Sequence, residues 1–273
     1  TTGRFASLNP NLQNIPIRTE AGRSIRKGMV AAEGRCLLSL DYSQIELRIM
    51  AMLSGDKELI KIFNDGIDVH TGVASRVFGV SPEEVTKQMR SRAKTINFGI
   101  IYGMGISALQ KNLGSTRDEA QQFHDAYFEN FTGVGKFIED TKAYANKHFY
   151  TETLFGRKRR FPALRSAMPF LRSMAERMAS NAPLQGTQAD IIKLAIRFAD
   201  EDLKAAGISD KVNLILQIHD ELVYEVDNDL ADQSEKIIRA AMENVFPRSY
   251  IEYKPEVPIL VSSGKGETLY DLK

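Results

Sequence analysis

The sequence predicts an α+β fold with few strands and many helices. A short apolar run at residues 36–40 ends at an acid, which is typical of a buried strand. Two more apolar runs, residues 212–218 and 222–226, flank the tripeptide His219-Asp220-Glu221 and are expected to be strands. The long stretch between residues 57 and 149 carries mostly helical spacing, broken at glycines.

Element by element, residues 45–53 have spacing that suggests a helix, and Ser81-Pro82 with Glu84 is typical of a helix N-terminus. Residues 115–131 and 134–149 are expected to be two further helices, followed by a basic turn or hairpin at residues 151–162. The remaining elements are predicted as a long helix over 168–203 interrupted near Pro183 and Gly186, a helix over 229–246 and a last strand over 257–261.

The composition is that of an ordinary globular protein of 273 residues, with 43% hydrophobic and 26% charged residues. A single thiol, Cys36, excludes an internal disulfide framework and is compatible with a reducing compartment. No apolar run approaches the roughly 20 residues of a membrane helix, and the polar first residues show no signal-peptide pattern.

Taken as a sum, the net charge of +1 argues against a nucleic-acid partner. The charges are unevenly distributed, however: residues 1–199 carry nine more basic than acidic side chains, and residues 200–273 carry eight more acidic than basic ones. A nucleic acid would meet this local distribution and not the sum, so the exclusion fails.

Acids follow two of the predicted strands, Asp41 after the first and Asp220-Glu221 between the later two. Taken alone, an acid after a strand is usually a turn former or a helix cap, and an acidic hairpin tip is usually solvated. Together, acids from separate strand ends can converge on one sheet edge. Carboxylates there suit Mg²⁺, which takes oxygen ligands and often shares them with substrate phosphates.

The segment from Arg90 to Gly103 is expected to be helical, with Arg90, Lys94, Phe98 and Tyr102 spaced four residues apart. Two cations followed by two aromatic rings suit a nucleoside triphosphate, because cations meet phosphates and rings meet sugar and base. The alternative is a surface helix with a hydrated basic turn and a buried aromatic end. Glycines within a helix favour the first interpretation, since they are costly and usually serve a contact.

These residues carry a resemblance to the C-terminal polymerase region of family A DNA polymerases. Asp41-Tyr42-Ser43-Gln44-Ile45-Glu46-Leu47-Arg48 resembles the family's motif A, Arg90 through Gly103 resembles motif B, and His219-Asp220-Glu221 resembles motif C. The resemblance covers essentially the whole chain, in the expected order. The further matching segments are Thr2-Gly3-Arg4, Asn11-Leu12-Gln13-Asn14-Ile15-Pro16, Thr153-Leu154-Phe155-Gly156-Arg157 and Gln185-Gly186-Thr187.

The resemblance implies a partial right-hand polymerase fold, with a palm built on a small antiparallel sheet and a mainly helical fingers domain. The implied bounds are 1–50 for the first part of the palm, 51–165 for the fingers and 166–273 for the rest of the palm. Thumb and any nuclease domains would lie upstream in the parent chain. The implied partners are primer–template DNA and dNTPs, with no membrane, and the implied protein is a cytoplasmic monomer.

The implied reaction is template-directed DNA synthesis, in which a primer 3′-hydroxyl attacks the dNTP α-phosphate and pyrophosphate leaves. Two Mg²⁺ ions would be held by Asp41, Asp220 and the backbone carbonyl of Tyr42. The resemblance assigns catalytic roles to Asp41, Asp220, Lys94 and Glu221. It assigns dNTP binding to Arg90, Lys94, Phe98, Tyr102, Glu46, Gln44 and His70.

Within this set, Glu46 with Phe98 and Tyr102 would exclude a ribose 2′-hydroxyl, and Lys94 would also protonate the leaving group. His70 would approach the phosphates, or else be a polar histidine at a helix start. The resemblance assigns DNA contacts to Arg4, Asn11, Asn14, Arg157, Arg177, Asn181, Gln185 and His219. For the basic turn from Arg157 to Arg160, a solvated turn is the alternative to a phosphate clamp.

Two other functions remain open at this stage. One is a non-catalytic DNA-binding remnant of the same fold, against which the intact Asp41, Lys94 and Asp220 argue. The other is a relative of single-subunit RNA polymerases, against which Glu46 and Phe98 argue because they favour deoxynucleotides. A comparison of dNTP with rNTP incorporation distinguishes a DNA polymerase from a relative of RNA polymerases.

Overall fold

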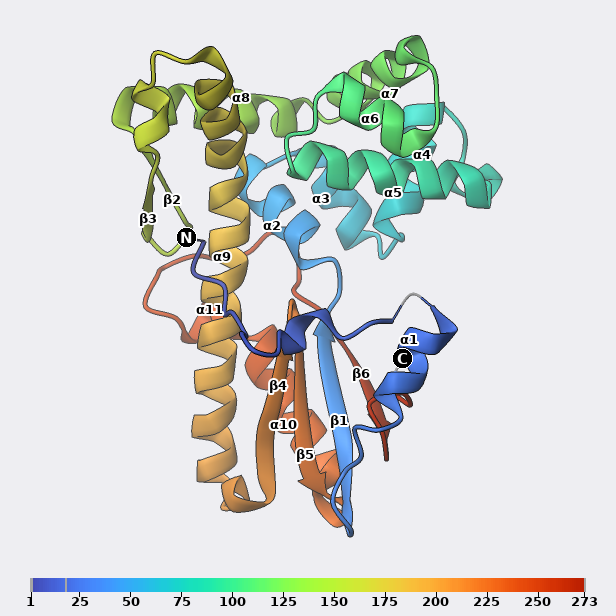
Figure 1. Cartoon of the computed structure of the whole chain (residues 1–273), viewed down its shortest axis with the longest axis vertical. Coiled ribbons are helices and arrows are strands. Elements are labelled where there is room, and N and C mark those ends of the chain that lie inside the picture. Colours follow the sequence, from blue (N-terminus) through green and yellow to red (C-terminus); the bar gives the residue numbers. More distant parts are fainter. Residues whose placement is uncertain (1, 18, 273) are drawn as a thin grey trace. The chain divides into compact units, whose positions relative to one another are not determined.

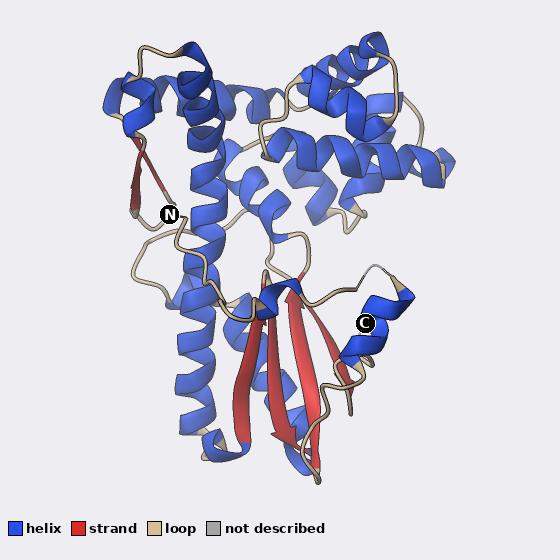
Figure 2. Cartoon of the chain, in the orientation of Figure 1, coloured by secondary structure: helices blue, strands red, loops and turns tan. Residues whose placement is uncertain are grey.

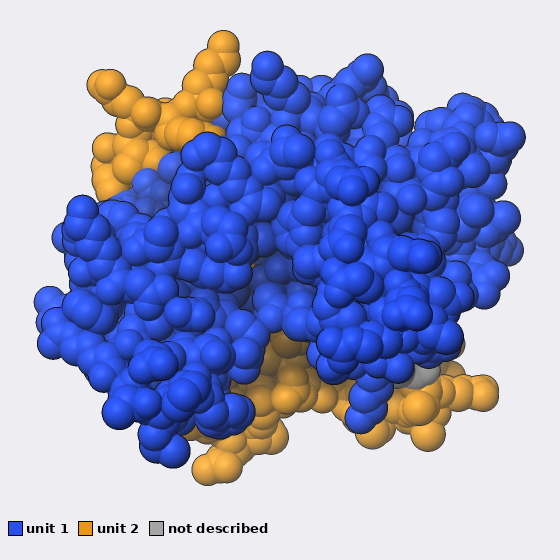
Figure 3. Space-filling view, turned by 90° about the horizontal axis from the view of Figure 1, so that it is seen from above, with its two compact units in different colours: residues 1–2, 46–187, 255–258 blue, residues 3–45, 188–254, 259–273 orange. Residues whose placement is uncertain are grey.

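The computed structural model describes residues 2–17 and 19–272 and divides them into two compact units (Figure 3). Unit 1 comprises residues 2, 46–187 and 255–258, and unit 2 comprises residues 3–17, 19–45, 188–254 and 259–272. The chain therefore leaves unit 2 after residue 45 and returns to it after residue 187. The assignment of a palm and a fingers domain stays a prediction.

Unit 2 is built on a four-stranded antiparallel sheet in the order β4-β5-β1-β6 (Figures 1 and 2). The sheet agrees with the α+β prediction. Its strands are β1 (Arg35–Tyr42), β4 (Val212–Ile218), β5 (Glu221–Asp227) and β6 (Val261–Gly266). The helices of this unit are α1 (Glu20–Arg26), α10 (Ala231–Glu243), α11 (Val245–Arg248) and the second half of α9 (Pro169–Ala205).

Strand β1 lies inside the sheet and is buried on both faces, which explains its continuous apolar sequence. On one face Leu37 packs with Val223, Leu269 and Leu272. On the other face lie the even-numbered residues, and the Tyr42 hydroxyl donates to the Met242 carbonyl at the end of α10 (2.9 Å). Helix α10 covers this second face (Figure 1).

Unit 1 is mainly helical, with one small hairpin (Figure 2). Its hairpin strands, β2 (Tyr150–Glu152) and β3 (Lys158–Arg160), pair in the basic region where the sequence predicts a turn or hairpin. It also contains the first half of α9. The other helices are α2 (Ile45–Ser54), α3 (Lys57–Asn64), α4 (Val69–Phe78), α5 (Lys87–Ile101), α6 (Ile106–Leu113), α7 (Arg117–Asn130) and α8 (Thr132–His148).

Two sequence predictions about elements are wrong. The long helix α9 is continuous through Pro183 and Gly186, because its buried face is held by packing that outweighs one missing N–H. The last strand begins at Val261 instead of residue 257, and Pro258, which cannot donate a ladder hydrogen bond, precedes it. In addition, the Ser81 capping box starts only a short 3₁₀ turn, Pro82–Glu84, and α5 has its own cap at Thr86.

Gly186 does not interrupt α9; its lack of a side chain instead leaves room for the hairpin that packs against the helix. A methyl group at this position would overlap the Thr153 side chain of the hairpin. We therefore expect Gly186→Ala to lower the free energy of unfolding by about 1–3 kcal/mol, despite the better helix propensity of Ala. Urea unfolding followed by circular dichroism measures this.

Gly99→Ala on α5 is the matched control. Its added methyl would make only ordinary contacts, 3.4 Å from Leu109 Cδ1 and 3.6 Å from Met104 Sδ. Helix propensity should then stabilise the protein by up to about 1 kcal/mol. Equal effects of the two substitutions would contradict the packing explanation.

Candidate active site

Three acidic residues of unit 2, Asp41, Asp220 and Glu221, lie at one end of the sheet. Asp41 lies near the end of β1, directly opposite Glu221 in the register of β1 and β5. Asp220 lies in the two-residue turn between β4 and β5, and its backbone carbonyl accepts a hydrogen bond from the Tyr42 amide (3.2 Å). The structure thus brings Asp41 close to the Asp220–Glu221 pair, which begins 179 residues later in the sequence.

These groups fit a hard divalent cation. Asp41 and Asp220 are half-buried, whereas Glu221 is only 2% exposed. The Tyr42 hydroxyl is committed to Met242, so Tyr42 could offer an ion only its backbone. Within residues 2–17 and 19–272 no group of three or more His, Cys, Asp and Glu side chains has the geometry of a metal site. Two carboxylates and a carbonyl suit an ion that completes its coordination with water or phosphate oxygens.

Helix α5 in unit 1 carries the predicted nucleotide-binding face. Thr86 caps its N-terminus by accepting from the Met89 amide, and Tyr102 ends it. The Phe98 and Tyr102 rings are nearly parallel, with centroids 6.3 Å apart. The Tyr102 hydroxyl donates to Glu46 Oε2 (3.0 Å), and Glu46 is almost fully buried. The three residues predicted to select the sugar therefore form one cluster.

His70 on α4 lies against α5, with its ring 6.0 Å from that of Phe98. Burial lowers the pKa of His70 to about 4; Asp68 opposes this shift, and Arg90 and Lys94 reinforce it. His70 Nδ1 lies 3.1 Å from the Asn97 amide nitrogen, which can only donate. In a neutral ring the hydrogen is then on Nε2. The structure therefore makes His70 an uncharged hydrogen-bond donor.

Arg90 is engaged by a carboxylate that the sequence analysis did not single out. Its Nε and Nη2 donate to Asp68 Oδ2 (2.8 Å) and Oδ1 (2.9 Å). Asp68 also caps α4 by accepting from the Thr71 amide and hydroxyl. Burial raises the pKa of Asp68, but the hydrogen bonds from Arg90 and Thr71 outweigh it and lower the pKa to about 2. A phosphate that binds Arg90 must therefore compete with Asp68.

The predicted DNA contacts on α9 lie on one side of the helix, at Arg177, Asn181 and Gln185. Asn181 Oδ1 is buried without a hydrogen-bond partner among the described residues. Arg177 packs beside the end of α5, since a methyl on Gly103 would lie 3.5 Å from its Cβ. Whether these residues contact DNA stays a prediction.

Arg157 is tied into its own unit. Its Nη2 donates to the carbonyls of Thr2 (2.6 Å) and Gly186 (3.0 Å). Arg157 Nη2 is thus engaged by two carbonyls, and a DNA contact by Arg157 stays a prediction. The exposed cations of the hairpin are instead Lys158 and Arg160.

The remaining predicted contacts lie in or next to the first segment and turns of unit 2. Arg4 donates from Nη2 to the buried Gln188 side chain, a partner that the sequence analysis missed. Asn11 caps a 3₁₀ turn that ends at Asn14, and both are exposed. Gln44 and His219 are exposed and have positive φ angles of 48° and 56°.

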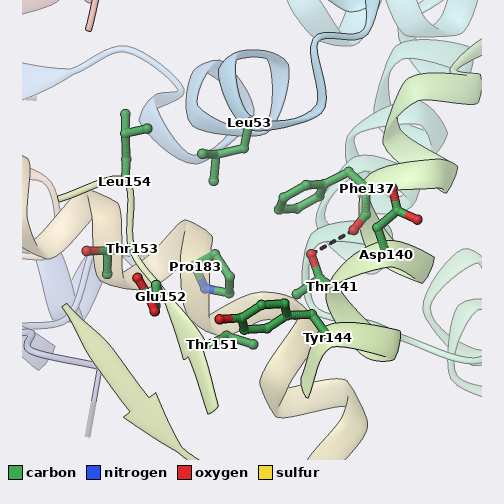
Figure 4. Close-up of a pocket in the computed structure, with 10 residues that line it drawn as sticks. All are labelled: Leu53, Phe137, Asp140, Thr141, Tyr144, Thr151, Glu152, Thr153, Leu154 and Pro183. Carbon is green, nitrogen blue, oxygen red and sulfur yellow. Dashed lines mark hydrogen bonds between the residues drawn. The ribbon is translucent and has the colours of Figure 1, made fainter. Parts of the chain in front are cut away.

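A hollow of about 510 Å³ in unit 1 holds none of the predicted site residues (Figure 4). Thr141 on its wall donates to the Phe137 carbonyl (2.7 Å), drawn as a dashed line. The hollow is lined by Leu53, Phe137, Asp140, Thr141, Tyr144, Thr151, Glu152, Thr153, Leu154 and Pro183. This hollow therefore does not mark the acids or the predicted face of α5.

Comparison with known proteins places the chain in a family. The model of DNA polymerase family A matches residues 1–271. The chain is 45% identical over 272 residues to the thermostable DNA polymerase I of Thermus filiformis, covering 100% of this chain and 31% of that protein. It is 44% identical over 244 residues to DNA polymerase I of Rhizobium leguminosarum, covering 89% of this chain and 24% of that protein.

A solved structure is also similar: the POL domain of Pol1 from M. smegmatis in complex with DNA primer-template and dNTP. It superposes with a TM-score of 0.92 at 44% identity, over 99% of this chain and 46% of that chain. This chain belongs to DNA polymerase family A. It spans about a third or less of the length of the curated relatives named here. None of the helices in the described ranges is long and apolar enough to cross a membrane.

The state of His70 gives a stability prediction. Its pKa is about 4 in the folded protein against an ordinary value of 6.5. Below pH 6.5, His70 binds a proton in the unfolded chain but stays neutral in the folded protein until the pH approaches 4. The free energy of unfolding should therefore fall as the pH drops, by about 2 kcal/mol from this group between pH 7.5 and pH 5.

Urea unfolding of wild type and His70→Gln at both pH values measures this contribution, which the substitution should remove. His148→Gln, which changes an exposed histidine, should keep it. If wild type and His70→Gln lose the same stability on acidification, His70 is not held neutral by its surroundings.

Proposed function

We propose that this chain carries out template-directed DNA synthesis by transferring a nucleotide from a dNTP to a primer 3′-hydroxyl with release of pyrophosphate. The observation that supports this most is the convergence of Asp41 and Asp220 at one end of the sheet in a family A chain. The M. smegmatis neighbour, a POL domain in complex with primer-template and dNTP, supports the same substrates. We propose that unit 2 serves as the palm and unit 1 as the fingers.

We propose that Asp41, Asp220 and the Tyr42 carbonyl hold two Mg²⁺ ions. When bound, such ions neutralise the phosphate charge and favour loss of the proton from the attacking hydroxyl. Glu221 supports this set from the position opposite Asp41 in the sheet. Little covalent chemistry falls to the protein, and its contribution is to position the reactants and balance their charge.

The face of α5 supplies the triphosphate contacts in this proposal. Arg90 exchanges its bond to Asp68 for one to a phosphate, and Lys94 adds a second positive charge and a proton for the leaving pyrophosphate. His70 donates from Nε2 without adding charge, because the Asn97 amide nitrogen can only donate to Nδ1. Gln44, an exposed residue close to the acids in sequence, is a further nucleotide contact.

The bond between Tyr102 and Glu46 supports the proposed selection of deoxynucleotides. It holds the Glu46 carboxylate at the hydroxyl of Tyr102, whose ring stacks on that of Phe98. A ribose 2′-hydroxyl would have to displace this bond to find a partner in the cluster, which disfavours rNTPs. The proposed duplex contacts are Arg4, Asn11, Asn14, Arg157, Arg177, Asn181, Gln185 and His219.

Primer extension by the protein at its natural length tests the reaction. We expect Asp41→Asn and Asp220→Asn each to reduce Mg²⁺-dependent single-nucleotide incorporation by roughly 10³-fold or more, because each removes a charge that holds the ions. Asp227→Asn is the matched control, since Asp227 lies at the other end of β5 and pairs with Arg35. Extension that survives both site substitutions, or prefers rNTPs, would contradict the proposal.

The pair of Arg90 and Asp68 gives a separate prediction. Asp68→Asn keeps a cap on α4, because Asn is also a good N-cap, but removes the charge that competes with phosphate. We expect the dNTP dissociation constant, measured by fluorescence titration, to fall roughly two- to fivefold. Glu58→Gln, which breaks the comparable pair with Arg76, should leave it unchanged. Weaker binding by Asp68→Asn would show instead that Asp68 orients Arg90 for the phosphate.

A further inference from the structure

The turn that carries Asp220 has an unfavourable backbone conformation. Only His219 and Asp220 separate β4 from β5, and His219 has a φ of 56°, in the left-handed region that favours glycine. A residue other than glycine keeps such a conformation only where its surroundings enforce it. Contacts from neighbouring residues must therefore hold this turn in its conformation.

Two glutamine side chains form a chain of hydrogen bonds that ends on this turn. Gln217 Nε2 donates to the His219 carbonyl (2.6 Å). Gln13 Nε2 donates to Gln217 Oε1 (2.8 Å) and lies 3.4 Å from the Gln217 carbonyl. Both side chains are half-buried, and all three residues belong to unit 2.

The chemistry of the amides fixes the direction of this chain. The His219 carbonyl can only accept, so Gln217 must present its NH₂ group there. This leaves the Gln217 side-chain oxygen as an acceptor, and Gln13 must in turn present its own NH₂ group. Flipping either amide would therefore break the chain of hydrogen bonds.

The starting point of the chain is itself held in place. Gln13 lies in a 3₁₀ turn, Leu12–Asn14, whose N-cap Asn11 accepts from the Gln13 amide (3.1 Å). The Ser7 hydroxyl accepts from the Leu12 amide (3.2 Å). The first segment of the chain thus supports a turn that lies more than two hundred residues away in the sequence.

We infer that Gln13 and Gln217 are positioning residues, which hold the His219–Asp220 turn so that the Asp220 carboxylate is set for a divalent ion. The inference rests on the proposed function, because it takes Asp220 as a metal ligand. Neither glutamine is itself offered as a ligand, and both act through the His219 carbonyl. The sequence analysis assigned a role to neither glutamine.

Gln13→Glu tests the inference with the smallest change in shape. The ionised carboxylate that it introduces can only accept, so Gln217 loses its donor or flips and gives up the bond to the His219 carbonyl. Two measured quantities should change. The Mn²⁺ affinity, measured by electron paramagnetic resonance, should fall roughly five- to tenfold. Amide hydrogen exchange, measured by mass spectrometry, should become faster in the peptide that covers residues 217–221.

Gln217→Met should have the same effects, and the double variant should be no worse than either single one because both act on one chain of bonds. Gln13→Lys keeps a hydrogen-bond donor at this position and should retain most of the Mn²⁺ affinity that Gln13→Glu loses. Gln121→Glu, which alters an exposed glutamine of α7, is the control and should change neither quantity.

Unchanged Mn²⁺ affinity in Gln13→Glu and Gln217→Met would overturn the inference. It would also be overturned if the affinity fell but amide hydrogen exchange became equally faster throughout the sheet, because the effect would then not be confined to the turn. The proposed function is judged separately by Asp220→Asn. If that substitution leaves activity and Mn²⁺ binding intact, the proposed function fails. If it abolishes both while the glutamine variants behave as wild type, only the inference fails.

Discussion

The register between β1 and β5 is the constraint on which the acidic site depends. Seven residue pairs, from Arg35 opposite Asp227 to Asp41 opposite Glu221, fix how the two strands meet. A slip of one residue would turn Asp41 to the other face of the sheet and bring apolar residues of β1 out of the core. The burial of Leu38 and Leu40 on one face and Leu37 on the other therefore stabilises the site as well as the fold.

The proposed nucleotide-binding face of α5 depends on a different constraint, the burial of polar groups against α4. His70 and Asn97 are both buried and satisfy each other in part through a single hydrogen bond. Asp68 caps α4 and holds Arg90, so the same carboxylate shapes the helix and controls a cation proposed to bind phosphate. Structural roles and proposed functional roles thus coincide in these side chains, and their substitution needs matched controls.

Much of the fold could be predicted because its signals are local. The buried strand at residues 36–40, the two strands around His219-Asp220-Glu221 and the helical spacing from Arg90 onward are patterns of a few consecutive residues. The continuity of α9 through Pro183 could not be predicted, since it depends on packing of the buried helix face against segments that are distant in the sequence. The family was identified from short motifs whose order along the chain made them specific.

The contacts that the sequence did not show join residues far apart in the chain. Nothing local in Asp68 indicates that it holds Arg90, and nothing local in Gln13 indicates that it supports the turn at His219. Such partners depend on side-chain geometry, which propensity and spacing do not encode.

The central claim is that Asp41 and Asp220 together hold the ions that drive nucleotide transfer. The most direct measurement is anomalous X-ray scattering from Mn²⁺ in crystals of the protein with primer–template DNA and a non-reactive dNTP. The account predicts two Mn²⁺ peaks, each within about 2.0–2.3 Å of an oxygen of Asp41 or Asp220. Mn²⁺ peaks that lie away from both carboxylates would contradict it.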